Sequence, residues 1–186
     1  MRFTLVKIVL AIFLSTSTAF PNSLIDSQKG MKSDSFVKAF LSLCAHSIGQ
    51  YDRTLEMSKI YTQQEIPEEF ITGLRPADPK AEFVGYVLMD IIESPLVFGV
   101  SRGEIGGEVL VSCTVSNPFI SVDAVAKDLE MIANLGEPDY DKSEMGQRYR
   151  LWNTNFWVQG SFILMTDISP MNEDGVTLGI IGPIDD

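Results

Sequence analysis

Histidine is almost absent from this chain of 186 residues, and its scarcity excludes several kinds of site. His46 is the only histidine. Metal centres that use several imidazoles are therefore excluded, and a serine or cysteine nucleophile has no second histidine to act as its base. The helical periodicity around His46 places it away from the apolar side of a predicted helix, so we expect it to face solvent. The sequence predicts no metal site and no bound cofactor.

Clusters of basic residues are also lacking. The chain has 14 Lys and Arg residues against 25 Asp and Glu residues, which gives a net charge of −11. Nucleic acids and anionic lipids are bound by clustered Lys and Arg, so this composition argues against both as partners. An acidic surface instead favours a cationic partner, such as a basic protein. The basic residues outside the first segment are scattered, as at Lys59, Arg75, Lys80, Arg102, Lys127 and Lys142.

Long apolar runs are missing too, apart from one short stretch near the start. Two basic residues and no acid precede the uncharged run Ile8–Leu14. This run is much shorter than the roughly 20 residues that span a bilayer. Ser17 and Ala19 follow at the small-x-small spacing that signal peptidase recognises, which places a cut before Phe20. These features predict a cleavable secretory signal peptide over 1–19 and export to the periplasm or the medium.

The rest of the chain is predicted to hold one domain. Cleavage after residue 19 removes two basic residues and leaves a net charge of −13. Residues 20–33 are polar and are expected to form a flexible N-terminal segment. Residues 34–186 are long enough to bury one core, and we expect a single α+β domain there.

The chain has only two cysteines, and both are predicted to face the core. Cys44 lies on the apolar side of a helix predicted over 34–48. Cys113 shares one side of a strand predicted over 108–116, where apolar and polar residues alternate. An exported protein with an even cysteine count favours a bridge, here closing a loop of about 70 residues, worth roughly 4 kcal/mol in the chain-entropy model. Two buried free thiols remain the alternative.

The first part of the domain reads as helices followed by strands. A second helix is predicted over 52–63, with Ile60 facing inward, and a short turn or helix over 67–73. The segment 83–92 is ambiguous, because Asp78-Pro79 suits a helix start whereas its aromatic and β-branched residues favour a strand. A strand over 96–102 and a tight turn at Gly106-Gly107 lead into the Cys113 strand, which makes an antiparallel meander.

The second part opens on the best-capped helix. Ser121 is the predicted N-cap, Asp123 lies in the first turn, where the helix dipole favours an acid, and Gly136 follows the end. A polar loop over 137–146 is expected next, and then three strands. The order of elements predicts an α+β fold in which each half runs from helix to meander, which makes an internal duplication conceivable. The three strands are predicted over 149–152, 156–167 and 176–181.

The arrangement of these elements resembles a known kind of protein. A first helix that carries a cysteine, the strand sequence Ser112–Val115 and the helix after it resemble small exported bacterial proteins of unknown function. The resemblance covers roughly 34–181. It implies the α+β fold and carries over no functional residue.

Two motifs match known sites only in part. The segment Gly99–Gly103 matches the G-x-S-x-G nucleophile elbow around Ser101, but that elbow requires a following helix and a later histidine. We expect a glycine-rich strand there. The segment Asp139–Glu144 begins like a calcium loop, yet Glu144 replaces the required glycine at its sixth position and Arg150 the glutamate at its twelfth. We expect a solvated acidic loop, with a weak calcium site as the alternative.

Aromatic residues are concentrated in the predicted hairpin over 149–167. Trp152 and Trp157 are the candidate anchors of a binding surface, because aromatic side chains are enriched where proteins bind partners. A sheet that buries these rings is the alternative. Together with export and the acidic charge, these residues lead to the hypothesis of an exported, non-enzymatic binding protein of the bacterial envelope or medium.

A small secreted hydrolase is the competing hypothesis. It requires a pair of carboxylates in a cleft, about 5 Å apart for retention or 6.5–9.5 Å for inversion. Glu104 and Glu108 beside the predicted turn, and Asp167 at a strand end, are the residues that such chemistry would use. No catalytic residue is assigned from the sequence.

Overall fold

The computed structural model describes residues 30–66, 76, 78, 80–92 and 94–184. These residues form an α+β fold in which helices cover one side of an antiparallel sheet of eight strands, so the predicted fold class is confirmed. The predicted signal peptide and the segment 20–29 lie outside the described residues, as does the turn or helix predicted over 67–73. None of the described helices is long and apolar enough to cross a membrane.

The described chain begins with two helices, as predicted. Helix α2 (Ser33–Cys44) buries an apolar side that includes Phe36, Phe40 and Cys44. A single turn of 3-10 helix, η2 (Ala45–Ser47), and Gly49 with a positive φ of 78° lead into α3 (Tyr51–Ser58). Helix α3 is shorter than predicted, and Ile60 is 78% exposed beyond its end, so the inward orientation expected for Ile60 was wrong.

Four strands follow in a meander. They are β1 (Gln63–Glu65), β2 (Glu82–Leu88), β3 (Leu96–Ile105) and β4 (Glu108–Asn117). Strand β2 shows that the first part of the ambiguous segment 83–92 is a strand, because its residues pair with β3 from Glu82↔Arg102 to Leu88↔Leu96. Residues 89–92 lie beyond the end of this strand and are not helical. The predicted turn at Gly106-Gly107 is present, and both glycines have a positive φ, as a two-residue hairpin turn requires.

Helix α5 (Val122–Ala133) opens the second half, with Ser121 at its N-cap position as predicted. The helix stops at Asn134, which adopts the left-handed conformation with φ 53°, two residues before the predicted stop at Gly136. The strands that follow are β5 (Tyr140–Glu144), β6 (Gln147–Asn153), β7 (Phe162–Asp167) and β8 (Val176–Pro183), with the short 3-10 helix η3 (Ser169–Met171) before β8.

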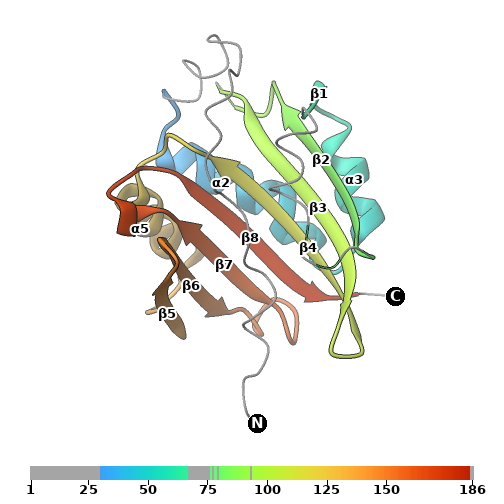
Figure 1. Cartoon of the computed structure of the whole chain (residues 1–186). Helices are drawn as coiled ribbons and strands as arrows, with labels where there is room; N and C mark the ends of the chain where they lie inside the picture. The colour runs from blue at the N-terminus through green and yellow to red at the C-terminus, as the bar shows by residue number, and fades with distance from the viewer. Residues whose placement is uncertain (1–29, 67–75, 77, 79, 93, 185–186) are drawn as a thin grey trace.

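The two meanders join through their last strands. The strand order is β1-β2-β3-β4-β8-β7-β6-β5, and β4 pairs with β8 in antiparallel register with Cys113 opposite Ile180. Each half therefore runs from helix to a meander of four strands, and the seam between the halves lies at the middle of the sheet (Figure 1). Long-range pairing of β4 with β8, which runs from Asn117↔Val176 to Leu110↔Pro183, makes one sheet and one core.

The core lies between the helices and the sheet. Helix α2 contacts α5, β4 and β8, and α3 contacts β3 and β4. In the register of the paired strands, the residues that face the helices include Phe98, Val100, Cys113 and Ile180. Burial of such apolar side chains is the main source of stability, at about 1.5–3 kcal/mol for each large side chain. The largest fully buried side chains include Phe36, Phe40, Leu43, Leu88, Leu96, Phe98, Leu129, Ile163, Met165 and Leu178.

Two predictions in the second half were wrong. The expected polar loop over 137–146 contains strand β5, which forms an edge of the sheet. Conversely, the strand predicted to begin at 156 begins at Phe162, and residues 154–161 form a loop between β6 and β7. This loop carries the exposed aromatic residues described below.

Candidate functional site

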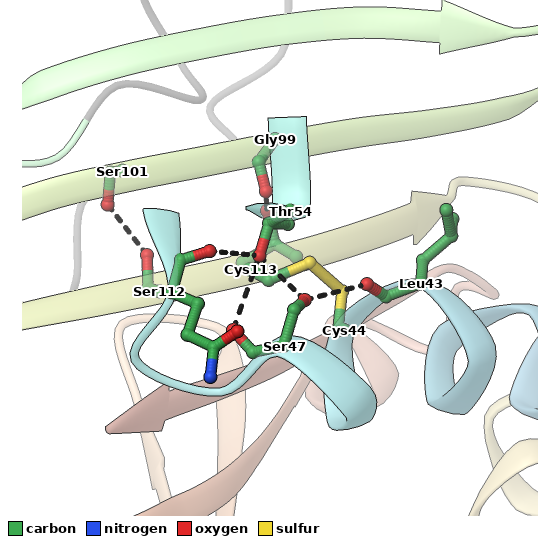
Figure 2. Close-up of a disulfide and its surroundings, with 10 residues drawn as sticks. Leu43, Cys44, Ser47, Thr54, Gly99, Ser101, Ser112 and Cys113 are labelled. Atoms are coloured by element: carbon green, nitrogen blue, oxygen red, sulfur yellow. Dashed lines mark hydrogen bonds between the residues drawn. A yellow bond between two sulfur atoms is a disulfide. The ribbon is translucent and has the colours of Figure 1, made fainter. Parts of the chain in front are cut away.

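The predicted cysteine pair lies within the core, between helix and sheet. Cys44 ends α2 and Cys113 lies on the side of β4 that faces it, and the pair is at disulfide distance with a Cα–Cα separation of 5.4 Å (Figure 2). Both residues are buried, with exposed fractions of 0% and 3%. The bridge ties α2 to β4, one of the two middle strands of the sheet. This location gives it a structural role.

Hydroxyl groups close to this pair complete the hydrogen bonds of the helix turn. Thr54 Oγ1 donates to Ser47 Oγ at 2.6 Å, and Ser47 Oγ donates to the Leu43 carbonyl at 3.2 Å (Figure 2). Thr54 and Ser47 are almost fully buried. Because buried hydroxyls need partners, these bonds hold the η2 turn against α3.

Ser101 lies in the middle of β3, so the structural context of a nucleophile elbow is absent from this segment. Its hydroxyl is 2.6 Å from the Ser112 hydroxyl on the neighbouring strand (Figure 2). The register places both residues on the sheet face opposite Val100 and Cys113, which face the helices. His46 lies on η2, on the side of the sheet that the helices cover, and it is exposed to solvent as predicted. The chain therefore brings no histidine to Ser101.

The segment that resembles a calcium loop forms the edge strand β5. Asp141 is held there by Arg148, which donates from Nε at 2.8 Å and from Nη2 at 2.6 Å. These hydrogen bonds lower the pKa of the Asp141 carboxyl below its usual value. A carboxylate engaged in this way and held on an extended strand does not have the arrangement of a calcium loop. Among the described residues, no group of three or more acidic, His or Cys side chains is placed to hold a metal ion.

A buried ion pair lies next to this edge. Arg150 Nη2 donates to Asp167 Oδ2 at 2.6 Å, and the two side chains are 7% and 0% exposed. Asp167 Oδ1 also accepts a hydrogen bond from the Ser169 backbone N–H at 3.0 Å and from the Ser169 hydroxyl. The pair thereby joins β6 to β7 and fixes the η3 turn. Sequence reasoning missed it because the partners are on different strands.

A shallow depression of about 550 Å³ lies beside these charges. It is open to solvent, and Asp141 and Arg148 on its wall bind one another. Because Asp141 and Arg148 neutralise one another, these two side chains offer little to a charged ligand. Its lining residues are Asp141, Lys142, Ser143, Arg148, Ser169 and Pro170.

The carboxylates considered for hydrolysis do not form a pair. Glu104 and Glu108 are exposed at the β3–β4 hairpin, which lies beyond Pro183 at the end of β8. Asp167 instead pairs with Val176 at the start of β8. Asp167 is also buried against Arg150. Sheet geometry therefore separates Asp167 from the two glutamates by the length of a strand, roughly 20 Å or more. The register pairs Glu104 with Val109 and Glu108 with Ile105, which places the two glutamates on opposite faces of the sheet.

The two tryptophans have different environments. Trp152 is only 2% exposed, and its indole N–H donates to the Gly136 carbonyl at 2.9 Å. It lies on the helix side of β6 and belongs to the core, so the structure contradicts its candidacy as a surface anchor. Trp157 is 37% exposed and its neighbour Phe156 63% exposed, in the loop between β6 and β7. We call residues 154–161 the aromatic loop.

Buried hydrogen bonds and packing against the core hold the aromatic loop in place. Thr154 and Ser161 at its two ends are 0% and 2% exposed, and their hydroxyls lie 2.8 Å apart. The Thr154 N–H donates to the Ser161 carbonyl at 3.0 Å, and the Trp157 N–H to the Thr154 carbonyl at 2.7 Å. Val158 packs against the core. These contacts fix the backbone beneath the two exposed rings.

The amide of Asn155 adds a further constraint. Its Oδ1 accepts a hydrogen bond from the Gly160 N–H at 2.7 Å, and Asn153 Oδ1 accepts one from the Asn155 N–H at 2.9 Å. Gly160 has a φ of 80°, a conformation that favours glycine. Asn and Gly in this loop thus build a compact turn. Asn and Gly are turn-forming residue types, so Asn153, Asn155 and Gly160 are the local sequence signal for this turn.

Further exposed apolar residues lie at the same end of the sheet. The Ile184 N–H donates to the Val109 carbonyl at 3.1 Å, and these side chains are 36% and 39% exposed. Gly160 of the aromatic loop lies against Pro183 at the end of β8. Figure 1 shows the aromatic loop beside the C-terminal end of β8 and the long β3–β4 hairpin. Exposed apolar side chains of the loop, the end of β8 and the hairpin therefore gather at one end of the sheet, which we call the apolar end and which also carries Glu104 and Glu108.

Comparison of the chain with protein-family models, with curated proteins and with solved structures finds no match. We therefore infer function from the residues of the site and their geometry.

Proposed function

We propose that this protein is an exported, non-enzymatic binding protein that captures a cationic partner through the aromatic loop. The observation that carries the proposal is the exposure of Phe156 and Trp157 on a loop whose backbone is fixed by buried hydrogen bonds. Exposed aromatic rings on a rigid loop lose little conformational entropy on binding, so they contribute efficiently to affinity.

Export is supported by two features. The N-terminal sequence has the pattern of a cleavable signal peptide, and Cys44 and Cys113 lie at disulfide distance. Disulfides persist in oxidising compartments and are rare in the cytosol. The site of action that we propose is the periplasm or the extracellular medium.

The choice of a cationic partner follows from charge. With a net charge of −11 for the whole chain, the protein attracts positively charged partners over a distance set by the screening length, about 8 Å at physiological ionic strength. Long-range attraction acts mainly on the rate of association, whereas a desolvated aromatic anchor acts mainly on dissociation. The two features therefore have separable kinetic effects.

The test is capture from envelope extract by the immobilised protein, followed by kinetics with each captured component. Trp157→Ala is compared with Met131→Ala, which truncates an apolar side chain that is 65% exposed on α5, outside the apolar end. We expect Trp157→Ala to speed dissociation about tenfold or more and Met131→Ala to leave it unchanged. Raising the salt concentration should mainly slow association.

Capture that is equal for the wild type and Trp157→Ala would contradict the proposal, even if proteins are recovered. Recovery of nothing at low or high salt, together with cleavage of a glycan or ester by the purified protein, would favour the hydrolase hypothesis instead.

A further inference from the structure

The rings of Phe156 and Trp157 stand at an angle to one another. Their centroids are 5.1 Å apart and their planes make an angle of 67°. In this edge-to-face arrangement the two ring faces form adjacent walls of a corner. Phe156 is 63% exposed and Trp157 37% exposed, so solvent reaches both residues.

We infer that this corner binds a single cationic side chain, the guanidinium of an arginine or the ammonium of a lysine in a basic segment of a partner protein. The inference rests on the proposed function and specifies how the loop recognises its partner. The face of an aromatic ring carries partial negative charge and attracts a cation held within about 6 Å of the ring centroid. Two walls contact such a cation from two sides, as in the aromatic cages that bind quaternary ammonium groups.

Acidic side chains stand on both sides of the aromatic loop. The Asp139 carboxylate accepts a hydrogen bond from the Asn153 N–H at 2.7 Å, directly before the loop begins. On the other side, Glu104 and Glu108 are exposed on the β3–β4 hairpin. Strand β8 lies between β7 and β4, so β4 lies about 10 Å to the side of β7, given a strand spacing of roughly 4.8 Å. Ser112 is level with the start of β7, and Glu108 lies about 13 Å further along β4. These distances exceed the screening length of about 8 Å at physiological ionic strength, so the hairpin carboxylates attract a cation at the corner when the ionic strength is low.

Arg102, two residues before Glu104 on β3, is already engaged. Arg102 donates to both carboxylate oxygens of Glu82 at 2.9 and 2.8 Å, and its guanidinium lies 4.8 Å from the centroid of the Tyr51 ring. The Tyr51–Arg102 contact shows that this chain already places a guanidinium over an aromatic face. The described residues of the aromatic loop itself are all uncharged. A cation from a partner is therefore the complementary occupant of the Phe156–Trp157 corner.

The experiment uses two synthetic peptides of the same length, one of alternating glycine and arginine and one in which citrulline replaces each arginine. Citrulline keeps the shape of the side chain and removes its charge. Binding to the mature protein is measured by calorimetry and by the fluorescence of Trp157, with Trp152 as the buried reference. We expect the arginine peptide to bind at least tenfold more tightly than the citrulline peptide.

Aromatic variants separate recognition at the corner from general attraction to an acidic protein. Trp157→Leu and Phe156→Leu keep an apolar side chain without a ring, and each should weaken the arginine peptide by about 2- to 30-fold, the range for exposed to desolvated cation–π contacts. Trp157→Phe should restore part of this loss. Circular dichroism and the melting temperature verify that each variant is folded. We expect all of them to fold, because both positions are exposed.

Matched charge variants test the acidic surroundings. Glu108→Gln and Glu130→Gln each remove one exposed negative charge, but Glu130 lies on α5 rather than on the hairpin. At low ionic strength we expect Glu108→Gln to weaken binding of the arginine peptide about twofold and Glu130→Gln to have a smaller effect.

Equal affinity of the arginine and citrulline peptides, or equal affinity of the wild type and both leucine variants for the arginine peptide, would overturn the inference. If Trp157→Ala still impairs capture of a partner from envelope extract in that case, the proposed function stands and the rings act as apolar anchors instead. If capture is also independent of Trp157, both fail.

Discussion

Arg150 and Asp167 form an ion pair that is closed off from solvent, with a distance of 2.6 Å between Nη2 and Oδ2. The partners come from adjacent strands, β6 and β7, and both face the helix side of the sheet. The Nε of Arg150 is buried and has no hydrogen-bond partner in the structure. In a buried charge pair with incomplete hydrogen bonds, the attraction between the charges offsets much of the free energy of desolvation but does not exceed it. Its role in this fold is to fix the register of β6 on β7 and the turn at η3.

Breaking this pair should be far more harmful than replacing it. We expect Asp167→Asn to lower the free energy of unfolding by about 3–5 kcal/mol, because it leaves the arginine buried without a counter-charge. The double replacement Arg150→Met with Asp167→Leu should recover most of this loss. Urea denaturation of the two variants and the wild type measures the difference. A double variant as unstable as Asp167→Asn would show that the pair is required for more than charge compensation.

Local patterns were sufficient for the elements that bury an apolar side. The periodicity over 34–48 and the alternation over 108–116 predicted α2 and β4, and with them the orientation of Cys44 and Cys113 toward one core. Both patterns reflect the burial of every third or fourth residue in a helix and of every second residue in a strand. Where burial determines the structure, the sequence carries the signal.

The errors fall where burial does not determine the structure. Strand β5 has an exposed, charged sequence and is a strand because it pairs with β6, with Arg148 binding Asp141 across the two. Charged edge strands of this kind protect a sheet from aggregation, and they look like loops in a sequence. Likewise, the aromatic content of 156–161 favoured a strand, whereas the hydrogen bonds of Asn155 form a loop. The pairing of β4 with β8 is a long-range contact that no local pattern specifies.

Loss of the disulfide should destabilise the mature protein strongly. The bridge between Cys44 and Cys113 closes a loop with a sequence separation of 69 residues, for which chain entropy gives roughly 4 kcal/mol. We expect Cys44→Ser with Cys113→Ser to lower the free energy of unfolding by about 2–5 kcal/mol. Mass spectrometry of the exported protein without reducing agent should find a mass two hydrogens below that of the dithiol and a start near Phe20. Two thiols that react after denaturation of that material would contradict the bridge.

Replacement of Ser101 should have little effect on function. Its hydroxyl pairs with that of Ser112 on the sheet face turned away from the helices and from His46. We expect Ser101→Ala to retain capture of the partner and to cost about 0.5–1.5 kcal/mol of stability through the lost hydrogen bond. The measurement is capture by the variant together with its melting temperature. Loss of capture at an unchanged melting temperature would assign Ser101 a functional role.

Stability at alkaline pH should depend on Tyr149. Burial, with a smaller contribution from Glu144, raises the pKa of the Tyr149 hydroxyl to about 12, against 10.0 for an unperturbed tyrosine. The folded state therefore binds this proton more tightly than the unfolded state does. The corresponding stability is fully present below about pH 10 and is lost as the pH rises toward 12. Ultraviolet titration should find one tyrosine fewer at high pH in Tyr149→Phe, and the fall in melting temperature above pH 10 should be less steep in that variant. An identical alkaline titration for the two proteins would show that the tyrosine with the raised pKa is not Tyr149.

The rigidity of the aromatic loop should matter as much as its rings. Asn155 is exposed, yet its side-chain oxygen accepts the Gly160 N–H at 2.7 Å and closes the turn beneath Phe156 and Trp157. Asn155→Ala removes this acceptor without altering either ring, so the loop must then be ordered during binding, at a cost of about 0.5–1.5 kcal/mol for each side chain that becomes immobilised. We expect affinity for the captured partner to fall about 2- to 10-fold, while the melting temperature changes little because the residue lies outside the core.

Asn155→Asp is the matched control, since it keeps an acceptor oxygen at the same position and should retain or increase affinity for a cationic partner. Hydrogen exchange of the Gly160 N–H reports directly on the loop, and it should be faster in Asn155→Ala than in Asn155→Asp. Faster exchange without any loss of affinity would mean that the partner selects the rings independently of how the loop holds them.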